Sequence, residues 1–310
     1  MFDRRQFVAR GAAAGLGGMV RGALALPPVR VAAALLIDSH VHVFKADPAF
    51  PFAAGAHPPA QDAPVETLLE LMKANGVSHT VLIQIIHYKW DNSYLASVLK
   101  RYPGVFHGVC RVNPEDPAAP DELSRLTEQG FRGVRLSPAA TAEGDWIRGP
   151  LMTPLWRRCG DLKVPMTVLA PVARLPDLVP LIEANPELDV VIDHMAMCPV
   201  DQPQQWKVLL DLARYPRVYV KISGLWDISK DAYPYADTQV RVRQLCDAFG
   251  SQRLMWATNW PVSLARLPYA EAVELYRDHM PYLSAAERED ILSRTVQRVW
   301  PFVGRRRSSL

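Results

Sequence analysis

Short apolar runs, many of them rich in β-branched residues, recur along the chain and alternate with segments whose apolar residues follow a helical period. Several of the runs are almost continuously apolar, which is typical of strands buried on both faces of a parallel sheet. The pattern predicts eight strands: Leu35–Asp38, Thr80–Ile85, Val105–Cys110, Arg132–Leu136, Pro165–Leu169, Leu188–Asp193, Val218–Ile222 and Leu254–Thr258.

Helices are predicted between most of these strands. Val65–Ala74 ends at Asn75-Gly76, a helix C-cap signal, and Leu175–Ala184 ends before Asn185-Pro186. The other predicted helices are Asn92–Tyr102, Asp121–Gln129, Pro203–Arg214, Asp237–Phe249, Tyr269–His279 and Ala285–Val299. The alternation predicts an α/β fold, a (β/α)8 TIM barrel in a single domain. A doubly wound open sheet is the alternative, but no Gly-rich phosphate-binding turn opens a helix.

The two ends of the chain fall outside this pattern. Residues 1–25 contain Arg4-Arg5, a Gly-rich, weakly apolar stretch and Ala23-Leu24-Ala25. These features are typical of a twin-arginine (Tat) signal peptide, so we expect export by the Tat machinery and a periplasmic location. A membrane anchor is the alternative, but the stretch is too short to span a bilayer, and we expect no stable membrane insertion after cleavage. The barrel domain is expected over residues 26–304, followed by a basic tail at 305–310.

Charge and cysteine content narrow the possible partners. The chain has 35 Lys and Arg against 32 Asp and Glu, but residues 1–25 hold four Arg and one Asp, which leaves 31 of each sign in the remainder. The one basic cluster is in the C-terminal tail, so we expect no nucleic-acid partner. Cys110, Cys159, Cys198 and Cys246 form no C-x-x-C motif. We expect buried free thiols, with a disulfide as the alternative.

The first predicted strand ends in Asp38-Ser39-His40-Val41-His42. Alternate residues of a strand point to the same face, so His40 and His42 should converge at its C-terminal end. Two converging imidazoles suit a metal ion or a polarised carbonyl. The alternative is a pair of histidines that only make ordinary hydrogen bonds at the end of the strand.

Polar residues follow most of the other strands at the same end, where TIM barrels carry their active sites. They are Gln84, Arg111, Arg135, Asp193-His194, Ser223 and Asn259. We expect Arg111 and Arg135 to bind a substrate carboxylate, because a guanidinium group pairs with it bidentately. For Arg111, a salt bridge at the surface or within a loop is the alternative. Gln84 and Ser223 are further substrate-binding candidates, with core hydrogen bonding or backbone packing as the alternatives. The long loop Phe44–Ala63 is expected to form a rim or lid.

Five motifs in barrel order resemble the amidohydrolase superfamily, in particular its amidohydrolase-related branch, which includes 2-pyrone-4,6-dicarboxylate and sugar-acid lactonases. The motifs are 37–42, 130–135, 191–194, 220–224 and 255–261. The resemblance spans essentially the whole chain after residue 25. It implies a hydrolase that opens a small carboxylated lactone or related cyclic ester by attack of water. The alternatives are a metal-dependent decarboxylase or amidohydrolase of the same superfamily, and a degenerate barrel that binds an organic acid without catalysis.

Two departures from the family pattern bear on the mechanism. Metal-dependent relatives place a histidine after the fifth strand, where this chain has Leu169-Ala170, and the family's eighth-strand aspartate is replaced by Asn259. An amide accepts no proton near neutral pH and is a poor metal ligand. We therefore favour a metal-independent site without a cofactor. A single divalent metal such as zinc on His40 and His42, with His194 as a third ligand, is the alternative.

Without a metal, we expect His40, His42 and His194 to donate hydrogen bonds to the substrate carbonyl and to the developing oxyanion. Asn259 remains at the catalytic position, but the base that activates water must lie elsewhere. His194 and Asp91 are the candidates for that base. Asp193 is expected to orient His194 or to face the helix layer.

Overall fold

The computed structural model describes residues 35–137 and 146–302, and all of them belong to one compact unit. The predicted signal peptide (1–25) and basic tail (305–310) lie outside these ranges, so both remain predictions. No helix within the described ranges combines the length and the hydrophobicity that crossing a bilayer requires.

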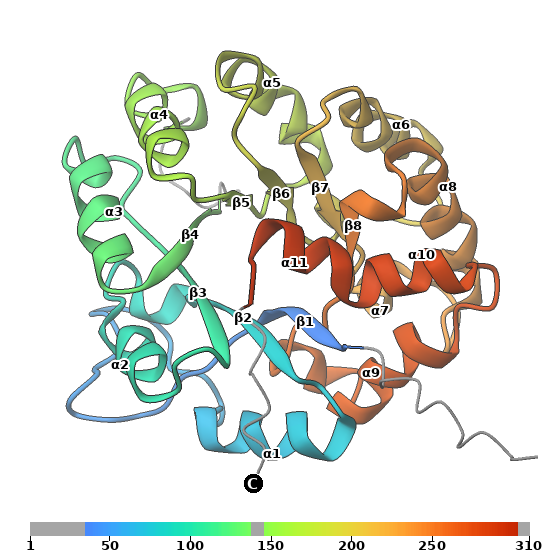
Figure 1. The fold of residues 1–310 in the computed structure, drawn as a ribbon, viewed down its shortest axis with the longest axis horizontal. Coiled ribbons are helices and arrows are strands. Elements are labelled where there is room, and N and C mark those ends of the chain that lie inside the picture. Colours follow the sequence, from blue (N-terminus) through green and yellow to red (C-terminus); the bar gives the residue numbers. More distant parts are fainter. Residues whose placement is uncertain (1–34, 138–145, 303–310) are drawn as a thin grey trace, which may run out of the picture. The chain divides into compact units, whose positions relative to one another are not determined.

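Eight parallel strands form one sheet in the order β1 to β8, with helices outside it (Figure 1). The strands are β1 (Ile37–Val41), β2 (His79–Ile83), β3 (Phe106–Cys110), β4 (Phe131–Leu136), β5 (Met166–Val168), β6 (Val190–Ile192), β7 (Val218–Lys221) and β8 (Leu254–Met255). All eight predicted strands are present, several of them shorter than predicted. The TIM-barrel prediction is therefore confirmed.

The barrel closes between β1 and β8 through a small set of hydrogen bonds. The backbone N–H of Asn259 donates to the carbonyl of His40 at 3.0 Å, and that of His42 donates to the carbonyl of Trp260 at 2.8 Å. The buried carboxylate of Asp38 accepts from the hydroxyl of Thr258 at 2.6 Å. These bonds hold the ends of β1 and β8 together, and His40, His42 and Asn259 all lie at this seam.

The helices largely follow the predicted pattern. They are α1 (Val65–Asn75), α2 (Ser93–Arg101), α3 (Ala119–Glu128), α4 (Met152–Leu162), α5 (Leu175–Ala184), α6 (Pro203–Leu210), α7 (Leu225–Ile228), α8 (Gln239–Phe249), α9 (Tyr269–Asp278), α10 (Ala285–Glu289) and α11 (Thr295–Val299). Helix α4 was not predicted, although its buried residues Met152, Leu155, Trp156 and Cys159 have the spacing of one helix face. The short helix α7 was also missed.

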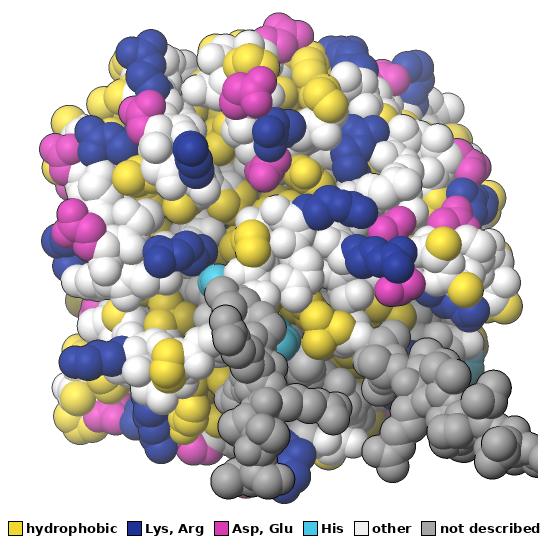
Figure 2. All heavy atoms as spheres, viewed as in Figure 1, with side chains coloured by type: hydrophobic (Ala, Val, Ile, Leu, Met, Phe, Trp, Pro, Cys, Tyr) yellow, Lys and Arg dark blue, Asp and Glu magenta, His cyan; other side chains and the backbone are white. Residues whose placement is uncertain are grey.

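Helices α10 and α11 run across the amino-terminal end of the barrel, in front of the strands in Figure 1. Trp300, which follows α11, is buried there in an apolar cluster with Ile37, Val81 and Met255 of the strands. On the face seen in Figure 2, basic and acidic side chains are interspersed. This end of the barrel is closed by apolar packing, which leaves the carboxyl ends of the strands for a site.

All four cysteines are buried and free, as predicted. Burial raises the pKa of each thiol, to about 11 for Cys198 and to about 12 for Cys246. Thiols with such raised pKa values carry almost no thiolate near neutral pH and are poor nucleophiles. We therefore assign the cysteines to packing and not to chemistry.

Candidate active site

A pocket of about 430 Å³ opens at the carboxyl ends of the strands, within the size range of small-molecule sites. Its most buried polar lining residues are His42, Arg135, His194 and Asn259, each less than a tenth exposed. Arg135 lies on β4, and the other three follow β1, β6 and β8. The pocket thus brings together four of the residues that the sequence singled out.

The loop after β1 forms part of the pocket wall through Phe44 and through Pro59, Ala60 and Gln61. The loop is tied down at several points. Phe44 and Ala63 form a two-way backbone bridge, and the N–H of Ala53 donates to the carbonyl of His87 at 2.9 Å. Of the two forms predicted for this loop, a rim or a lid, the structure shows an anchored rim of the pocket.

His40 and His42 face each other at the end of β1, with 3.2 Å between their Nε2 atoms. His42 donates from Nδ1 to the carbonyl of Ile83 at 2.7 Å. Burial lowers the pKa of His42 to about 3 and that of His40 well below its ordinary value, so both rings are neutral. A neutral His42 that donates from Nδ1 has an acceptor at Nε2. We therefore assign the proton between the rings to Nε2 of His40.

Lys221 is the main residue that sequence reasoning missed. It lies on β7, is fully buried, and holds its Nζ 3.2 Å from Nδ1 of His40 and 3.1 Å from Oδ1 of Asp193. An ammonium donates only, so Nδ1 of His40 accepts, which agrees with a proton on Nε2. The signal in the sequence was a single lysine inside the apolar run Val218–Ile222.

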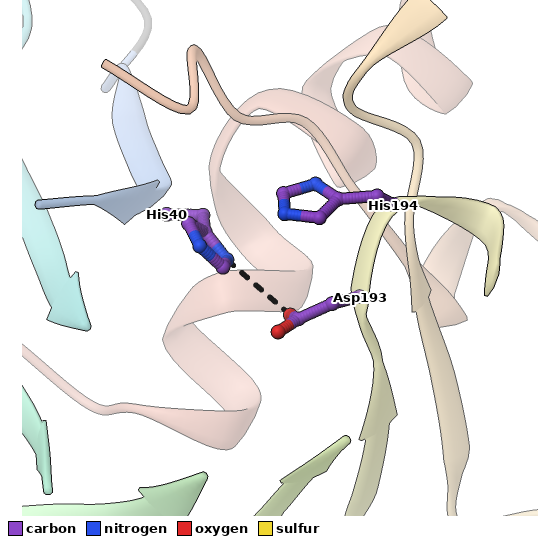
Figure 3. A group of neighbouring side chains, drawn as sticks. All are labelled: His40, Asp193 and His194. Atoms are coloured by element: carbon purple, nitrogen blue, oxygen red, sulfur yellow. Dashed lines mark ion pairs between the residues drawn. The ribbon is translucent and has the colours of Figure 1, made fainter. Parts of the chain in front are cut away.

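Asp193 points into the barrel, where its Oδ1 lies 3.3 Å from Nδ1 of His40 (Figure 3) and its Oδ2 accepts from Nε of Arg135 at 2.9 Å. Burial alone would raise the pKa of Asp193, but Lys221, His40 and Arg135 hold it well below its ordinary value. The prediction that Asp193 orients His194 or faces the helices was wrong. Asp193 instead pairs with buried cations from β4 and β7, Arg135 and Lys221, which compensate its charge inside the barrel.

His194 opens an unusual left-handed turn. The four residues His194–Met197 all have φ between 50° and 53°, a conformation that costs roughly 1–2 kcal/mol per residue. The turn places Nδ1 of His194 2.6 Å from the Oγ of Ser223, and burial lowers the pKa of His194 to about 4. His194 is therefore neutral near pH 7 and lines the pocket. Strain of this kind is concentrated at functional sites.

Two polar groups beside His194 have hydrogen-bonding capacity to spare. Asn259, also left-handed with φ of 55°, has a buried Oδ1 without a hydrogen-bond partner. Arg135 uses Nε on Asp193, and neither of its terminal nitrogens bonds to another described residue. An unpaired acceptor and unpaired donors in one buried pocket are what a polar ligand would satisfy.

Arg111 and Gln84 do not line this pocket. The buried guanidinium of Arg111 donates to the hydroxyl of Ser137 at 3.1 Å and packs on the ring of Trp90, and no described carboxylate pairs with it. Burial, followed by the charge of Arg135, lowers the pKa of Arg111 to about 9, so the group remains charged at neutral pH. Gln84 uses its amide on the backbone of Asp91 and Ile85.

Asp91, the second candidate base, is exposed at the start of α2. Its carboxylate accepts from the backbone N–H of Ser93 at 2.8 Å. It does not line the pocket. Among the described residues, this leaves His194 as the better placed of the two candidate bases.

One group of described residues could hold a metal ion. Donor atoms of His40, Asp193 and His194 all lie within 4.8 Å of one another, and nitrogen and carboxylate donors suit zinc in kind. However, the ammonium of Lys221 already lies next to the donor atoms of His40 and Asp193. A metal bound by both His40 and His42 would also require Nε2 of His40 to be deprotonated. The neutral ring would then carry its proton on Nδ1, which faces the ammonium of Lys221. The present charge arrangement therefore fits a metal poorly.

The comparisons with known proteins agree with the fold and the motifs. A model of the Amidohydrolase family matches residues 37–302. The chain is 31% identical over 240 residues to an L-fucono-1,5-lactonase of Burkholderia ambifaria, a match that covers 73% of this chain and 80% of the relative. A candidate 2-pyrone-4,6-dicarboxylic acid hydrolase of Pseudomonas putida matches with a TM-score of 0.76 and 29% identity, over 87% of this chain and 98% of that one. An amidohydrolase of Burkholderia multivorans with bound zinc matches with a TM-score of 0.71 and 24% identity, over 87% and 100% of the two chains.

Proposed function

The chain belongs to the amidohydrolase family, and we propose that it is a hydrolase that opens a small carboxylated lactone, or a related cyclic ester, without a metal ion. One observation carries the proposal: a neutral His194, the unpaired Oδ1 of Asn259 and the terminal nitrogens of Arg135, which bond to no other described residue, line the same pocket. These groups match a water, a carbonyl and a carboxylate. The similarity to a lactonase supports the same reaction class.

In the reaction that we propose, a water molecule donates one hydrogen bond to Oδ1 of Asn259 and the other to Nε2 of His194. Its oxygen attacks the lactone carbonyl while its proton passes to His194. Arg135 donates to the carbonyl oxygen or to the substrate carboxylate and stabilises the negative charge. The ring C–O bond then breaks, and His194 returns the proton to the leaving alkoxide. The product is the ring-opened hydroxy acid.

The roles of the paired histidines differ from the sequence-based expectation. The hydrogen bonds of His42 leave an acceptor at Nε2, and His40 lies behind it, outside the pocket lining. Neither ring presents a free N–H to a substrate carbonyl in this arrangement. We therefore propose that the pair positions its neighbours, and that Arg135 and His194 act on the substrate.

We propose that Lys221 supplies the buried positive charge that a metal supplies in metal-dependent enzymes. Its ammonium lies 3.1 Å from Asp193 and 3.2 Å from His40 and is fully buried. Two cations in such a space repel each other strongly at low dielectric. Titration of the purified protein with zinc tests this: wild type should bind weakly and Lys221→Met more tightly. Stoichiometric zinc in wild type would contradict the proposal.

The function itself is tested with a five-membered lactone that carries a carboxylate and with its methyl-amide analogue. Wild type should hydrolyse the carboxylated lactone faster than the methyl-amide analogue. Arg135→Gln should lower kcat/KM for the carboxylated lactone by about 10- to 100-fold, because a hydrogen bond to a charged group contributes roughly 1.5–3 kcal/mol. Arg132→Gln is the matched control, since Arg132 lies on the same strand but is exposed. Absence of hydrolysis of any lactone would overturn the proposal.

Asn259 is the residue that separates a working enzyme from a barrel that only binds an acid. An aspartate introduced by Asn259→Asp would add a charge beside the neutral His194. For a native hydrolase that uses His194, we expect this variant to be no faster than wild type. If only the Asn259→Asp variant hydrolyses lactones, the native barrel binds without turnover and the proposed activity is wrong.

We also propose that the protein is exported through the Tat pathway into the periplasm, on the basis of Arg4-Arg5 and the sequence up to Ala25. Replacement of both arginines by lysine should hold the full-length protein in the cytoplasm. Mass spectrometry of the periplasmic fraction should find a wild-type chain that begins after Ala25. A wild-type protein that keeps its first 25 residues in the cytoplasm would contradict this.

A further inference from the structure

Three large apolar side chains stand exposed around the mouth of the pocket. Ile86 after β2, Met197 after β6 and Val262 after β8 are 58%, 44% and 54% exposed, and all three line the pocket. We call them the apolar collar. Single exposed apolar residues are ordinary, but three that converge on one opening from three separate loops indicate a binding surface.

The apolar surface continues from the collar into the pocket. Phe44, Ile85 and Ile228 line its wall, and Leu169 stands directly after β5. Among the described lining residues, the polar ones are the groups already assigned to the reaction and four others, His42, Gln61, His87 and Asp227. The wall therefore offers few partners for the hydroxyl groups of a sugar lactone, and each buried hydroxyl without a partner would cost affinity.

Met197 also has an unusual backbone conformation. It is the last residue of the left-handed turn that begins at His194, with φ of 52°. The backbone thus holds an exposed apolar side chain in a strained conformation beside the pocket. The side chain is 44% exposed, so the fold leaves it open to contact with an apolar ligand.

We propose that the substrate is a lactone with an apolar substituent, an alkyl chain or an aryl ring, that lies against the apolar collar while the carbonyl or the carboxylate of the lactone accepts from Arg135. The inference rests on the proposed function and narrows its substrate class. A protein partner is the other conceivable occupant of the collar. We favour the substrate because the apolar surface runs on into the pocket, and a partner seated on the collar would cover the entrance.

The test compares three probes: a five-membered lactone with one carboxylate, its pentyl-substituted derivative, and an aldonolactone. We expect kcat/KM to be at least about tenfold higher for the pentyl derivative than for the unsubstituted lactone, because methylenes in an apolar pocket discriminate by roughly 10- to 200-fold. The aldonolactone should be the poorest substrate. Equal values for the first two probes would overturn the inference and leave the proposed function standing.

The collar is tested by the triple variant Ile86→Thr, Met197→Gln, Val262→Thr. It should remove most of the pentyl preference, which is measured as the ratio of kcat/KM for the pentyl derivative to kcat/KM for the unsubstituted lactone. Val240→Thr is the matched control, because Val240 is 56% exposed on α8 and does not line the pocket. A pentyl preference that survives in the triple variant would show that the collar is not the contact.

Binding separates failure of this inference from failure of the proposed function. Carboxylated cyclopentanones with and without the pentyl chain resemble the lactones but cannot be hydrolysed. Tighter calorimetric binding of the pentyl ketone, without hydrolysis of any lactone, would support the apolar ligand class and contradict the hydrolase. Equal binding, together with wild-type self-association that the triple variant abolishes, would assign the collar to a protein contact and overturn the inference.

Discussion

The two ends of the barrel are both buried, but one is packed with apolar side chains and the other with charged and polar ones. The amino-terminal end is filled by Trp300 and Val296 against apolar residues of the strands. The carboxyl end holds Lys221, Asp193 and Arg135, with three neutral histidines around them. Apolar packing needs no particular partner, whereas each buried charge must be matched by another. The amino-terminal end therefore contributes mainly to stability, whereas the charged groups of the carboxyl end fit together in one arrangement.

Lys221 lies where the two ends meet. Its Nζ is 5.4 Å from the centre of the Trp300 ring on one side and 3.1 Å from Asp193 on the other. A cation above an indole ring is attracted by the negative face of the ring. The apolar end thus helps to fix the position of the charge on which the carboxyl end depends. We therefore expect substitutions at the carboxyl end to change kcat/KM and substitutions at the amino-terminal end to change the free energy of unfolding.

The largest expected effect is on catalysis at the carboxyl end. His194→Gln should lower kcat/KM by roughly 100- to 10,000-fold, the range for loss of a general base, with little change in melting temperature. His107→Gln is the matched control, since His107 lies on β3 and contacts the carbonyl of Pro301 at the opposite end. Steady-state kinetics on the carboxylated lactone measures both. Equal losses in the two variants would contradict the division between the ends.

Substitution at the apolar end should act on stability instead. Trp300→Ala removes a fully buried indole and should lower the free energy of unfolding by about 3–5 kcal/mol. Urea denaturation measures this loss. At a temperature where the variant is folded, kcat/KM should remain within severalfold of wild type. A loss of activity as large as that of His194→Gln would show that the two ends are not separable.

Lys221 should show both effects. Lys221→Met removes one of the two buried cations that pair with Asp193 and leaves only Arg135, and breaking a buried ion pair costs about 3–5 kcal/mol. The double variant with Asp193→Asn should recover part of that stability in urea denaturation, because no unpaired carboxylate remains. It should not recover kcat/KM, because His40 stays without its donor. Full recovery of activity would assign Lys221 to packing alone.

The smallest effect is a shift in pH dependence. Burial lowers the pKa of His194 from 6.5 to about 4, so the ring is deprotonated and able to accept a proton at every pH above that value. We expect kcat/KM to be flat above about pH 5 and to fall as the pH drops through 4, where His194 becomes protonated. The carboxyl group of the substrate is titrated separately, and circular dichroism monitors the fold. A midpoint near 6.5 would exclude a buried His194 as the base.

Much of this architecture could be predicted from the sequence, because strand burial and strand ends leave local signals. The alternation of apolar runs predicted the barrel, and four residues placed at strand ends, His42, Arg135, His194 and Asn259, lie in one pocket. The roles of Lys221 and Asp193 could not be predicted. A lysine inside an apolar run marks Lys221, and a strand end marks Asp193, but the role of each depends on a partner from another strand. The left-handed turn at His194 is likewise invisible to a pattern of alternating faces.

Hydrolysis of a carboxylated lactone without a metal is tested by elemental analysis combined with kinetics on the same sample. The purified protein is treated with a chelator, its zinc content is determined, and kcat/KM for the carboxylated lactone is measured before and after zinc is added back. We predict substoichiometric zinc and an unchanged kcat/KM at every step. An activity that rises in proportion to bound zinc, or that is lost with the metal, would contradict metal-independent hydrolysis.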